Sequence, residues 1–319
     1  MIIETLFCKN SFINIKGIKF IIFIFFIFLI FFFNEIQLFK KNSATKMANN
    51  ISFRRCYYSS DNSNIRIIHL IFTRFIMEFW NKKHFRHVIY KKRFILNGIR
   101  VMKKYLLPSL ENQSCRNFIW ILTIGKKVSK TYIKSLLNFD YSFQYEILFS
   151  DNIKYYVRNI SKGFDVLITT LIDYDDRIYY DAVNDVRKAI NINRPLIIHG
   201  YTRGVYYFEQ NNKYYELFGN FNNSGPMSVF HSLITVLNKV NDSYTIFDLH
   251  GHSICRKILL KKYKSFGIKN LNYEPAIFDS GDIKFVWVRQ KFSALYNNSI
   301  RKQKTLKLFN FNLSNFYGK

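Results

Sequence analysis

The chain has 319 residues, enough for one large α/β domain with an appended segment and too few for two full-sized enzyme domains. Its 48 lysines and arginines outnumber its 21 aspartates and glutamates by 27, so it would attract phosphorylated substrates, acidic membranes or other polyanions. We do not expect nucleic acid to be the partner, because the cations are spread along the chain in short groups that no recognisable nucleic-acid-binding module frames.

The first feature along the chain is an apolar run, Phe20–Phe33, in which every residue is Phe, Ile or Leu. The run is shorter than the ~20 residues that comfortably cross a bilayer, but apolar neighbours lengthen it on both sides. A cleavable signal would need small residues after the run, whereas Asn34 to Gln37 offer none. We therefore predict an uncleaved signal anchor within residues 1–41, with a signal-peptide core or a buried helix as alternatives. Lysines at both ends leave its orientation open.

Residues 42–64 are polar and are predicted to form a stem or linker, followed by a folded domain at 65–319. From Ile65 onward short apolar runs alternate with amphipathic stretches, which favours an α/β fold with a mainly parallel, Rossmann-like sheet flanked by helices. The predicted strands are Ile65–Phe72, Phe118–Thr123, Tyr145–Phe149 and Phe164–Ile172. The predicted helices are Lys91–Leu107, ended by Pro108, Lys130–Leu137 and Tyr179–Ile190. A hairpin is predicted from Leu196–Tyr201 and Val205–Phe208.

The four cysteines, Cys8, Cys56, Cys115 and Cys255, are far apart in the sequence and include no CxxC pair. This spacing indicates neither a zinc site nor a disulfide framework. Cys115 lies beside an apolar strand pattern, so we expect it to be a small buried residue.

An acidic cluster, Asp173-Tyr174-Asp175-Asp176, directly follows the strand predicted at Phe164–Ile172. Ligands of open α/β sheets bind beyond the carboxyl ends of strands, and carboxylates this close repel one another unless a cation lies among them. Mg²⁺ or Mn²⁺ suits such oxygen ligands and commonly completes its shell with phosphate and water. The cluster therefore predicts a metal-bridged diphosphate site. The alternative is a chance triplet in which Asp176 caps the following helix.

A set of short motifs follows in a specific order between Ile65 and Ser299. They are Thr73-Arg74-Phe75, Arg93-Phe94, Leu107-Pro108-Ser109-Leu110, Asn112-Gln113-Ser114, Phe118-Ile119-Trp120, Thr170 to Asp176, Gly225-Pro226-Met227-Ser228, His252-Ser253 and Trp287-Val288-Arg289. Together they resemble the rhamnosyltransferase family of GT-A-like glycosyltransferases. The resemblance implies a GT-A-like fold, a nucleotide-sugar donor and a divalent metal. The chain departs from the family at Leu171, where an arginine is usual, and at Tyr174, which interrupts a usually more acidic cluster.

The resemblance also implies roles for single residues. Donor binding falls on Thr73, Arg74, Asp173 and Arg289, and Lys291 is a further cation that could neutralise a diphosphate. The metal falls on Asp173, Asp175 and His252, with Asp176 in a supporting or capping position and His250 a weaker candidate than His252. The catalytic base is unassigned, and Asp248 and Asp279 are the candidates.

The expected function is thus a metal-dependent glycosyltransferase that acts on an unknown glycan, lipid or protein acceptor, with rhamnose as one candidate sugar. Two other classes stay open, a basic nucleic-acid-binding protein and a catalytically inactive membrane-anchored adaptor. Metal-dependent binding of a nucleotide sugar would distinguish the enzyme from both.

Overall fold

The computed structural model describes residues 65–76, 90–138, 140–201, 203–218, 230–249, 276–279 and 283–289. The chain divides into two compact units, Met1–Ser52 and Phe53–Lys319, and all these residues belong to the second unit. Within the described ranges no helix is long and apolar enough to cross a membrane. The predicted anchor at Phe20–Phe33 lies outside those ranges.

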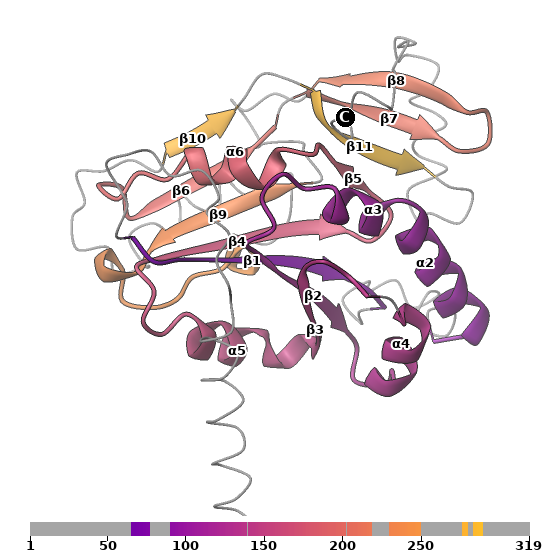
Figure 1. Ribbon diagram of the computed structural model, residues 1–319, viewed down its shortest axis with the longest axis horizontal. Coiled ribbons are helices and arrows are strands. Elements are labelled where there is room, and N and C mark those ends of the chain that lie inside the picture. Colours follow the sequence, from indigo (N-terminus) through magenta and orange to yellow (C-terminus); the bar gives the residue numbers. More distant parts are fainter. Residues whose placement is uncertain are drawn as a thin grey trace, which may run out of the picture. The chain divides into compact units, whose positions relative to one another are not determined.

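A seven-stranded sheet with the order β10-β6-β9-β4-β1-β2-β3 forms the framework of the second unit (Figure 1). Its strands are β1 (Ile67–Arg74), β2 (Ile119–Ile124), β3 (Gln144–Phe149), β4 (Val166–Asp173), β6 (Leu196–Gly200), β9 (His231–Val236) and β10 (Ala276–Asp279). Neighbouring strands are parallel except at β9, which is antiparallel to β4 and β6. The predicted mixed α/β fold with a mainly parallel sheet is therefore confirmed.

The order of the strands places a topological switch point between β1 and β4. From β1 the chain adds β2 and β3 on one side, and it then returns to add β4 on the other side. Both strands are buried along their length except at the last residue, as expected of strands covered on both faces. Diverging connections leave a crevice at the carboxyl ends of such a strand pair, which is where ligands of open α/β sheets bind.

Helices and a 3-10 segment cover the two faces of this sheet. They are α2 (Lys92–Lys104), α3 (Leu106–Glu111), α4 (Lys130–Leu137), α5 (Ile153–Ile160), α6 (Ala182–Lys188) and the 3-10 segment η4 (Ile246–Leu249). Side chains of α2, α3, α4 and α6 share one buried cluster with Ile71 of β1 and Ile168 of β4. Side chains of α5 and η4 share a second cluster with Leu70 and Leu167 on the opposite face. The sheet is thus the middle of three layers.

A second, four-stranded sheet has the order β5-β11-β7-β8. Its strands are β5 (Arg177–Ile178), β7 (Arg203–Phe208), β8 (Lys213–Phe218) and β11 (Ile283–Arg289). The strand β11 is antiparallel to β5 and parallel to β7, so it joins two segments that are distant in sequence. Since β5 directly follows the acidic cluster, the cluster connects β4 of the first sheet to β5 of the second.

Two sequence-based expectations about local structure are wrong, and the capping role offered as an alternative for Asp176 is not observed. The helix predicted at Lys91–Leu107 breaks at Tyr105 (φ −119°, ψ −61°), and Pro108 lies in the first turn of α3, where its missing N–H removes no helical hydrogen bond. The hairpin predicted after Leu196 does not form, because β6 and β7 belong to different sheets. Asp176 does not cap the next helix, since α6 begins at Ala182 with Asp181 as its N-cap residue.

A row of polar side chains crosses the buried face that α6 covers. The Nε2 atom of His69 lies 2.7 Å from the hydroxyl of Thr170, which lies 2.6 Å from the hydroxyl of Ser232. Burial, followed by the nearby charges of Arg187 and His199, lowers the pKa of His69 well below its ordinary value. His69 is therefore neutral in the folded protein at neutral pH.

Cys115 is buried, as expected, but it also forms a disulfide that the cysteine spacing did not indicate. The chain contains three other cysteines, and all of them lie outside the described residues. Spacing in the sequence failed here because a disulfide depends on proximity in the fold, and a long intervening loop is compatible with it.

Candidate functional site

Arg74 and Asp173 meet at the switch point, at the carboxyl ends of β1 and β4. They are register partners in the parallel pair formed by these strands. The Nη2 atom of Arg74 donates to Oδ1 of Asp173 at 3.0 Å, and their side chains are 26% and 24% exposed. Because an arginine and a carboxylate end adjacent strands, this edge offers opposite charges to a ligand that binds at the carboxyl ends of the strands.

The acidic cluster forms a tight turn directly after Asp173. The backbone N–H of Asp176 donates to the carbonyl oxygen of Asp173 at 3.3 Å. Tyr174 is mostly buried and packs edge-on against the ring of Phe75 at 5.4 Å between ring centroids. Burial, followed by the charges of Asp175, Asp173 and Asp176, raises the pKa of Tyr174 above its ordinary value. Tyr174 thus anchors the turn in the core, while Asp173 and Asp175 stay partly exposed and Asp176 is buried.

A divalent ion at this turn would rest on few protein ligands. No group of three or more His, Cys, Asp or Glu side chains is placed to hold a metal ion within the described ranges. Asp173 already accepts from Arg74, which leaves Asp175 as the second partly exposed carboxylate. One or two carboxylates completed by phosphate and water is a common arrangement for Mg²⁺, so these residues fit an ion that arrives with a diphosphate.

Thr73 does not contribute its side chain to this edge. It is fully buried, and its hydroxyl accepts a hydrogen bond from Nε1 of Trp120 at 2.9 Å. The hydroxyl of Thr123 donates to the carbonyl oxygen of Thr73 at 3.0 Å. Thr73 therefore fixes the end of β1 against β2, and its assignment to donor binding has no support in its side-chain contacts.

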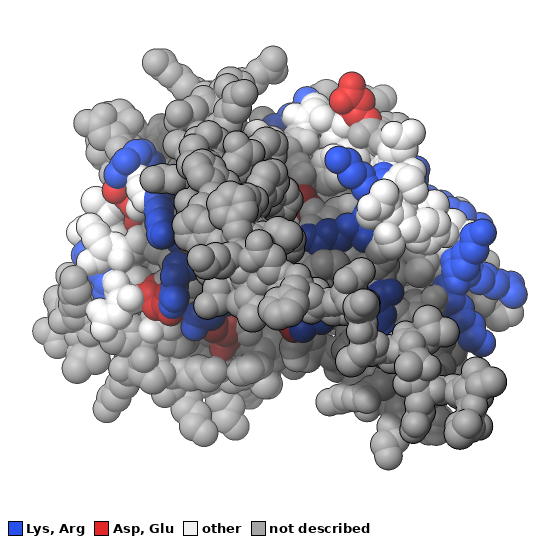
Figure 2. Space-filling view, turned by 90° about the horizontal axis from the view of Figure 1, so that it is seen from below, with Lys and Arg blue, Asp and Glu red and all other residues white. Residues whose placement is uncertain are grey.

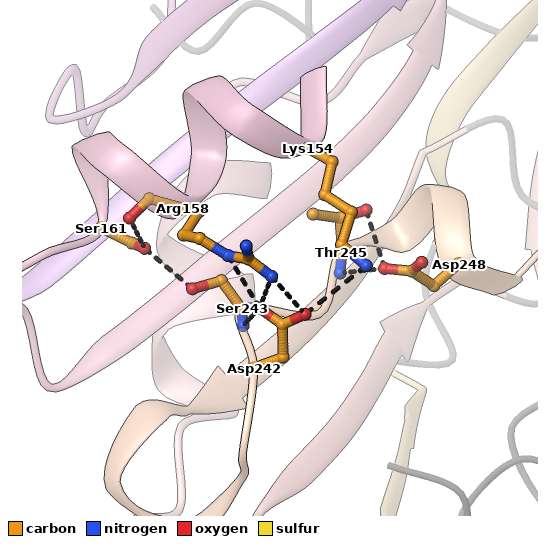
Figure 3. A network of polar contacts seen from close by, with 7 residues as sticks. All are labelled: Lys154, Arg158, Ser161, Asp242, Ser243, Thr245 and Asp248. Atoms are coloured by element: carbon orange, nitrogen blue, oxygen red, sulfur yellow. Dashed lines mark hydrogen bonds and ion pairs between the residues drawn. The ribbon is translucent and has the colours of Figure 1, made fainter. Parts of the chain in front are cut away.

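Asp248, one candidate for the catalytic base, holds a local turn at the start of η4. Its Oδ2 atom accepts from the backbone N–H of Thr245 at 2.8 Å and from the Thr245 hydroxyl at 3.2 Å (Figure 3). The segment η4 itself packs against β1, because the ring of Phe247 lies edge-on to the ring of Phe72, with 5.0 Å between the ring centroids. These contacts give Asp248 a structural role.

The remaining predicted residues are placed by their backbone alone or lie outside the described part of the chain. Asp279 ends β10 at the same sheet edge as Asp173 but three strands from β4, roughly 14 Å at the usual spacing between strands. Arg289 ends β11, which runs antiparallel to β5 and therefore toward the acidic turn. His250, His252 and Lys291 lie outside the described residues.

A polar pocket of about 380 Å³ lies at the opposite edge of the sheet, near the amino end of β4. Asp242 lies at its wall and accepts two hydrogen bonds from Nη2 of Arg158, at 2.9 and 3.0 Å, with Lys154 nearby (Figure 3). The hydroxyls of Ser161 and Ser243 lie 3.0 Å apart. The pocket is positively charged on balance, because Asp242 alone faces Arg158, Lys154 and the lining residue Lys162. It lies at the edge of the sheet opposite to the Arg74–Asp173 pair.

Sequence reasoning missed Arg177, which follows the acidic cluster directly. Its guanidinium carbon lies 4.6 Å from the centroid of the Tyr105 ring, and its Nη2 atom donates to the carbonyl oxygen of Lys104 at 3.4 Å. Arg177 thereby ties the end of the acidic turn to the junction of α2 and α3. An arginine next to three aspartates was visible in the sequence, but its aromatic partner was not.

No protein-family model matches the chain, and no curated protein matches it by sequence. Similar solved structures include a protein described as a nucleotide-diphospho-sugar transferase from Desulfovibrio desulfuricans, with 12% identity over 75% of this chain and 96% of that one and a TM-score of 0.35. HddC from Yersinia pseudotuberculosis has 11% identity over 69% and 92%, with a TM-score of 0.34. The inositol-1-phosphate CTP transferase from T. maritima has 10% identity over 75% and 97%, also at 0.34. A rhamnosyltransferase is not among these structures, so that resemblance stays a prediction.

Proposed function

We propose that this chain is a glycosyltransferase that binds a nucleotide-sugar donor together with Mn²⁺ or Mg²⁺. The observation that carries the proposal is the Arg74–Asp173 pair, which ends β1 and β4 on either side of the switch point. A donor diphosphate needs positive charge, and its metal ion needs carboxylate oxygens. The arginine and the carboxylate lie side by side at this edge of the sheet.

The pair suggests how donor binding would proceed. The guanidinium of Arg74 pairs with the carboxylate of Asp173. An arriving diphosphate would draw Arg74 into charge-assisted hydrogen bonds with phosphate oxygens, which leaves Asp173 and Asp175 to face a divalent ion. The ion, when bound, would neutralise the charge that develops on the leaving nucleoside diphosphate. Asp175 is the principal protein ligand in this proposal, because Asp173 must first release Arg74 before it can face the ion.

The other roles remain proposals that follow from the family resemblance. His252 would reach the metal or diphosphate from the carboxyl-terminal half, and Arg289 would add positive charge on the side where β11 ends. Asp279 is the better placed of the two candidate bases, since it ends a strand at the same edge. The acceptor is unspecified, and rhamnose is a candidate sugar through the resemblance alone.

The test is Asp175→Asn in the full chain, which keeps the size of the side chain but removes the charge that would hold the cation. We expect Mn²⁺-dependent release of nucleoside diphosphate from the correct nucleotide sugar to fall by at least about a hundredfold, the scale seen when one stabiliser of a developing charge is removed. The measurement is donor turnover and binding across a panel of nucleotides and nucleotide sugars, with and without Mn²⁺.

The matched control is Asp140→Asn, because Asp140 is exposed and lies outside the acidic turn. Asp181 and Asp185 are unsuitable controls, since Asp181 accepts from Ser114 and Asn184, and both aspartates pair with Lys188. Near-normal Mn²⁺-dependent turnover in Asp175→Asn would refute the metal assignment. Binding of nucleic acid with sequence preference, together with no affinity for any nucleotide sugar, would favour the nucleic-acid alternative. A folded chain without affinity for any of these ligands would favour the inactive adaptor.

A further inference from the structure

A basic stripe runs along the exposed face of α2. It consists of the exposed cations Lys92, Arg93, Arg100 and Lys103, with the exposed Leu96 among them. At about 100° per residue, these five side chains fall within an arc of roughly 100° around the helix axis. The helix contains no acidic residue. In the view from below in Figure 2, Lys and Arg side chains gather at the right-hand side of the molecule. The helix α2 lies on the same side in Figure 1.

We propose that the basic stripe of α2 binds the surface of an anionic phospholipid bilayer. Each Lys or Arg near such a surface contributes about 1 kcal/mol of attraction, and the attraction weakens as salt screens it. The buried face of α2, which includes Ile95, Ile99 and Met102, packs in the core. The helix would therefore lie on the phosphate groups through its charges rather than insert into the hydrocarbon.

The stability of the helix explains the position of Lys103, which lies in the last turn where the dipole favours a cation, but not the positions of the cations in the first turn. Lys92 and Arg93 occupy the first turn, where the helix dipole favours acidic side chains and disfavours cations by some tenths of a kcal/mol each. The N-cap residue, Lys91, makes no side-chain capping hydrogen bond. Lys92 and Arg93 add to the positive potential that the helix dipole already creates at the amino end of α2. This potential would attract an anionic partner.

Neighbouring elements extend the positive surface. Lys127, which precedes α4, lies 5.6 Å from the centroid of the Tyr90 ring just before α2, and Lys134 of α4 is exposed. At the carboxyl end of the helix, Lys104 pairs with Glu209. The positive surface thus continues from α2 toward α4.

Three features favour a bilayer over nucleic acid as the partner. Leu96 is 41% exposed within the stripe, and an apolar side chain among cations suits the boundary between head groups and acyl chains. The exposed positions of α2 include no aromatic side chain on which a base could stack. The same chain carries the apolar run Phe20–Phe33, which is predicted to enter a membrane.

The test uses the full chain, reconstituted in vesicles of phosphatidylcholine alone or of phosphatidylcholine mixed with phosphatidylserine. A water-soluble amine reagent modifies exposed lysines, and mass spectrometry reads the modification of each one. We expect Lys92 and Lys103 to react several-fold more slowly in the anionic vesicles, and high salt to remove the difference. Lys162 and Lys213, which are exposed elsewhere, should react alike in both.

The variant Arg93→Glu/Arg100→Glu should lose this protection at Lys92 and Lys103 while Mn²⁺-dependent nucleotide binding persists, so the stripe and the donor site can fail separately. A matched reversal of two exposed cations elsewhere, Arg116→Glu/Lys213→Glu, should keep the protection. Equal reactivity in the two kinds of vesicle would overturn the proposal. Protection by RNA in neutral vesicles as strong as that by phosphatidylserine, at the same salt concentration, would assign the stripe to nucleic acid instead.

Discussion

The ion pair between Arg74 and Asp173 matters for where it places two charges rather than for the stability of the fold. Both side chains are about a quarter exposed, so solvent screens the pair and its net contribution to folding is small. Parallel register holds the two groups at the ends of neighbouring strands whether or not a ligand is present. Each group can therefore exchange its partner for a ligand of the same charge without a change in the backbone.

His69 gives a prediction for the pH dependence of stability. The pKa of His69 is low in the folded protein, whereas the unfolded chain takes up this proton near pH 6.5. The unfolded state therefore binds more protons as the pH falls below 6.5, and the free energy of unfolding should decrease by up to about 1.4 kcal/mol per pH unit from this group. Urea unfolding of the full chain in detergent at pH 7.5, 6.5 and 5.5 would measure it.

The variant His69→Gln isolates the contribution of this histidine, because glutamine can still hydrogen-bond to Thr170 but does not titrate. We expect the variant to be less stable at pH 7.5 and less dependent on pH below 6.5 than the parent chain. Identical pH dependence in both proteins would show that His69 does not control acid sensitivity and that its burial does not lower its pKa.

Among the elements, α2 is coupled to the acidic turn through one glycine. A Cβ atom added at Gly98 would lie 2.5 Å from Cε2 of Phe75, whose ring is fully buried and packs against Tyr174. Alanine favours a helix over glycine by about 1 kcal/mol, but overpacking a core costs about 1–3 kcal/mol. We expect Gly98→Ala to lower the free energy of unfolding and to weaken nucleotide binding several-fold, as measured by urea unfolding and by titration.

The matched control is Leu96→Ala on the exposed side of the same helix, which should leave nucleotide binding unchanged. A gain in stability of about 1 kcal/mol in Gly98→Ala, with normal binding, would mean that Phe75 shifts without cost. In that case the contact between α2 and the acidic turn would have no functional weight.

At the scale of the whole molecule, the boundary between the two compact units predicts an independent domain. The chain without residues 1–50 retains the whole of the second unit and loses the apolar run at Phe20–Phe33. We expect it to be soluble and to unfold in one cooperative transition, as followed by circular dichroism and gel filtration. Aggregation of this shorter chain, while the full chain is monodisperse in detergent, would place the apolar run in the core of the fold.

The sequence predicted the parallel strands well because their signal is local. The strands predicted near β1, β2, β3 and β4 each form within about two residues of their expected bounds, and the helix at Lys130–Leu137 matches α4. The acidic turn was found because Asp173 follows a continuous buried strand. These predictions needed only apolar periodicity and the rule that ligands bind at carboxyl ends.

Long-range pairing was not visible in the same way. Nothing local to Leu196–Gly200 indicates that β6 pairs with β9 and β10 rather than with β7. The burial of Thr73 depends on Trp120 of the next strand, and the anchoring of Tyr174 depends on Phe75. Such roles arise from contacts across the fold, which periodicity in one segment does not record.

The position of β11 has a consequence for how the protein is made. Its partner β5 ends at Ile178, and β11 begins about 105 residues later at Ile283, so synthesis at roughly 5–20 residues per second separates the two strands by ~5–20 s. Throughout this interval the nascent chain contains β4, the acidic turn and β5, but it lacks the strand with which β5 pairs. A ribosome that stops before Ile283 would release a chain with open edges at β5 and β7, which are templates for aggregation and targets for chaperones. Among the described strands, β11 is thus the last to leave the ribosome, and it completes the sheet that begins just after the acidic turn.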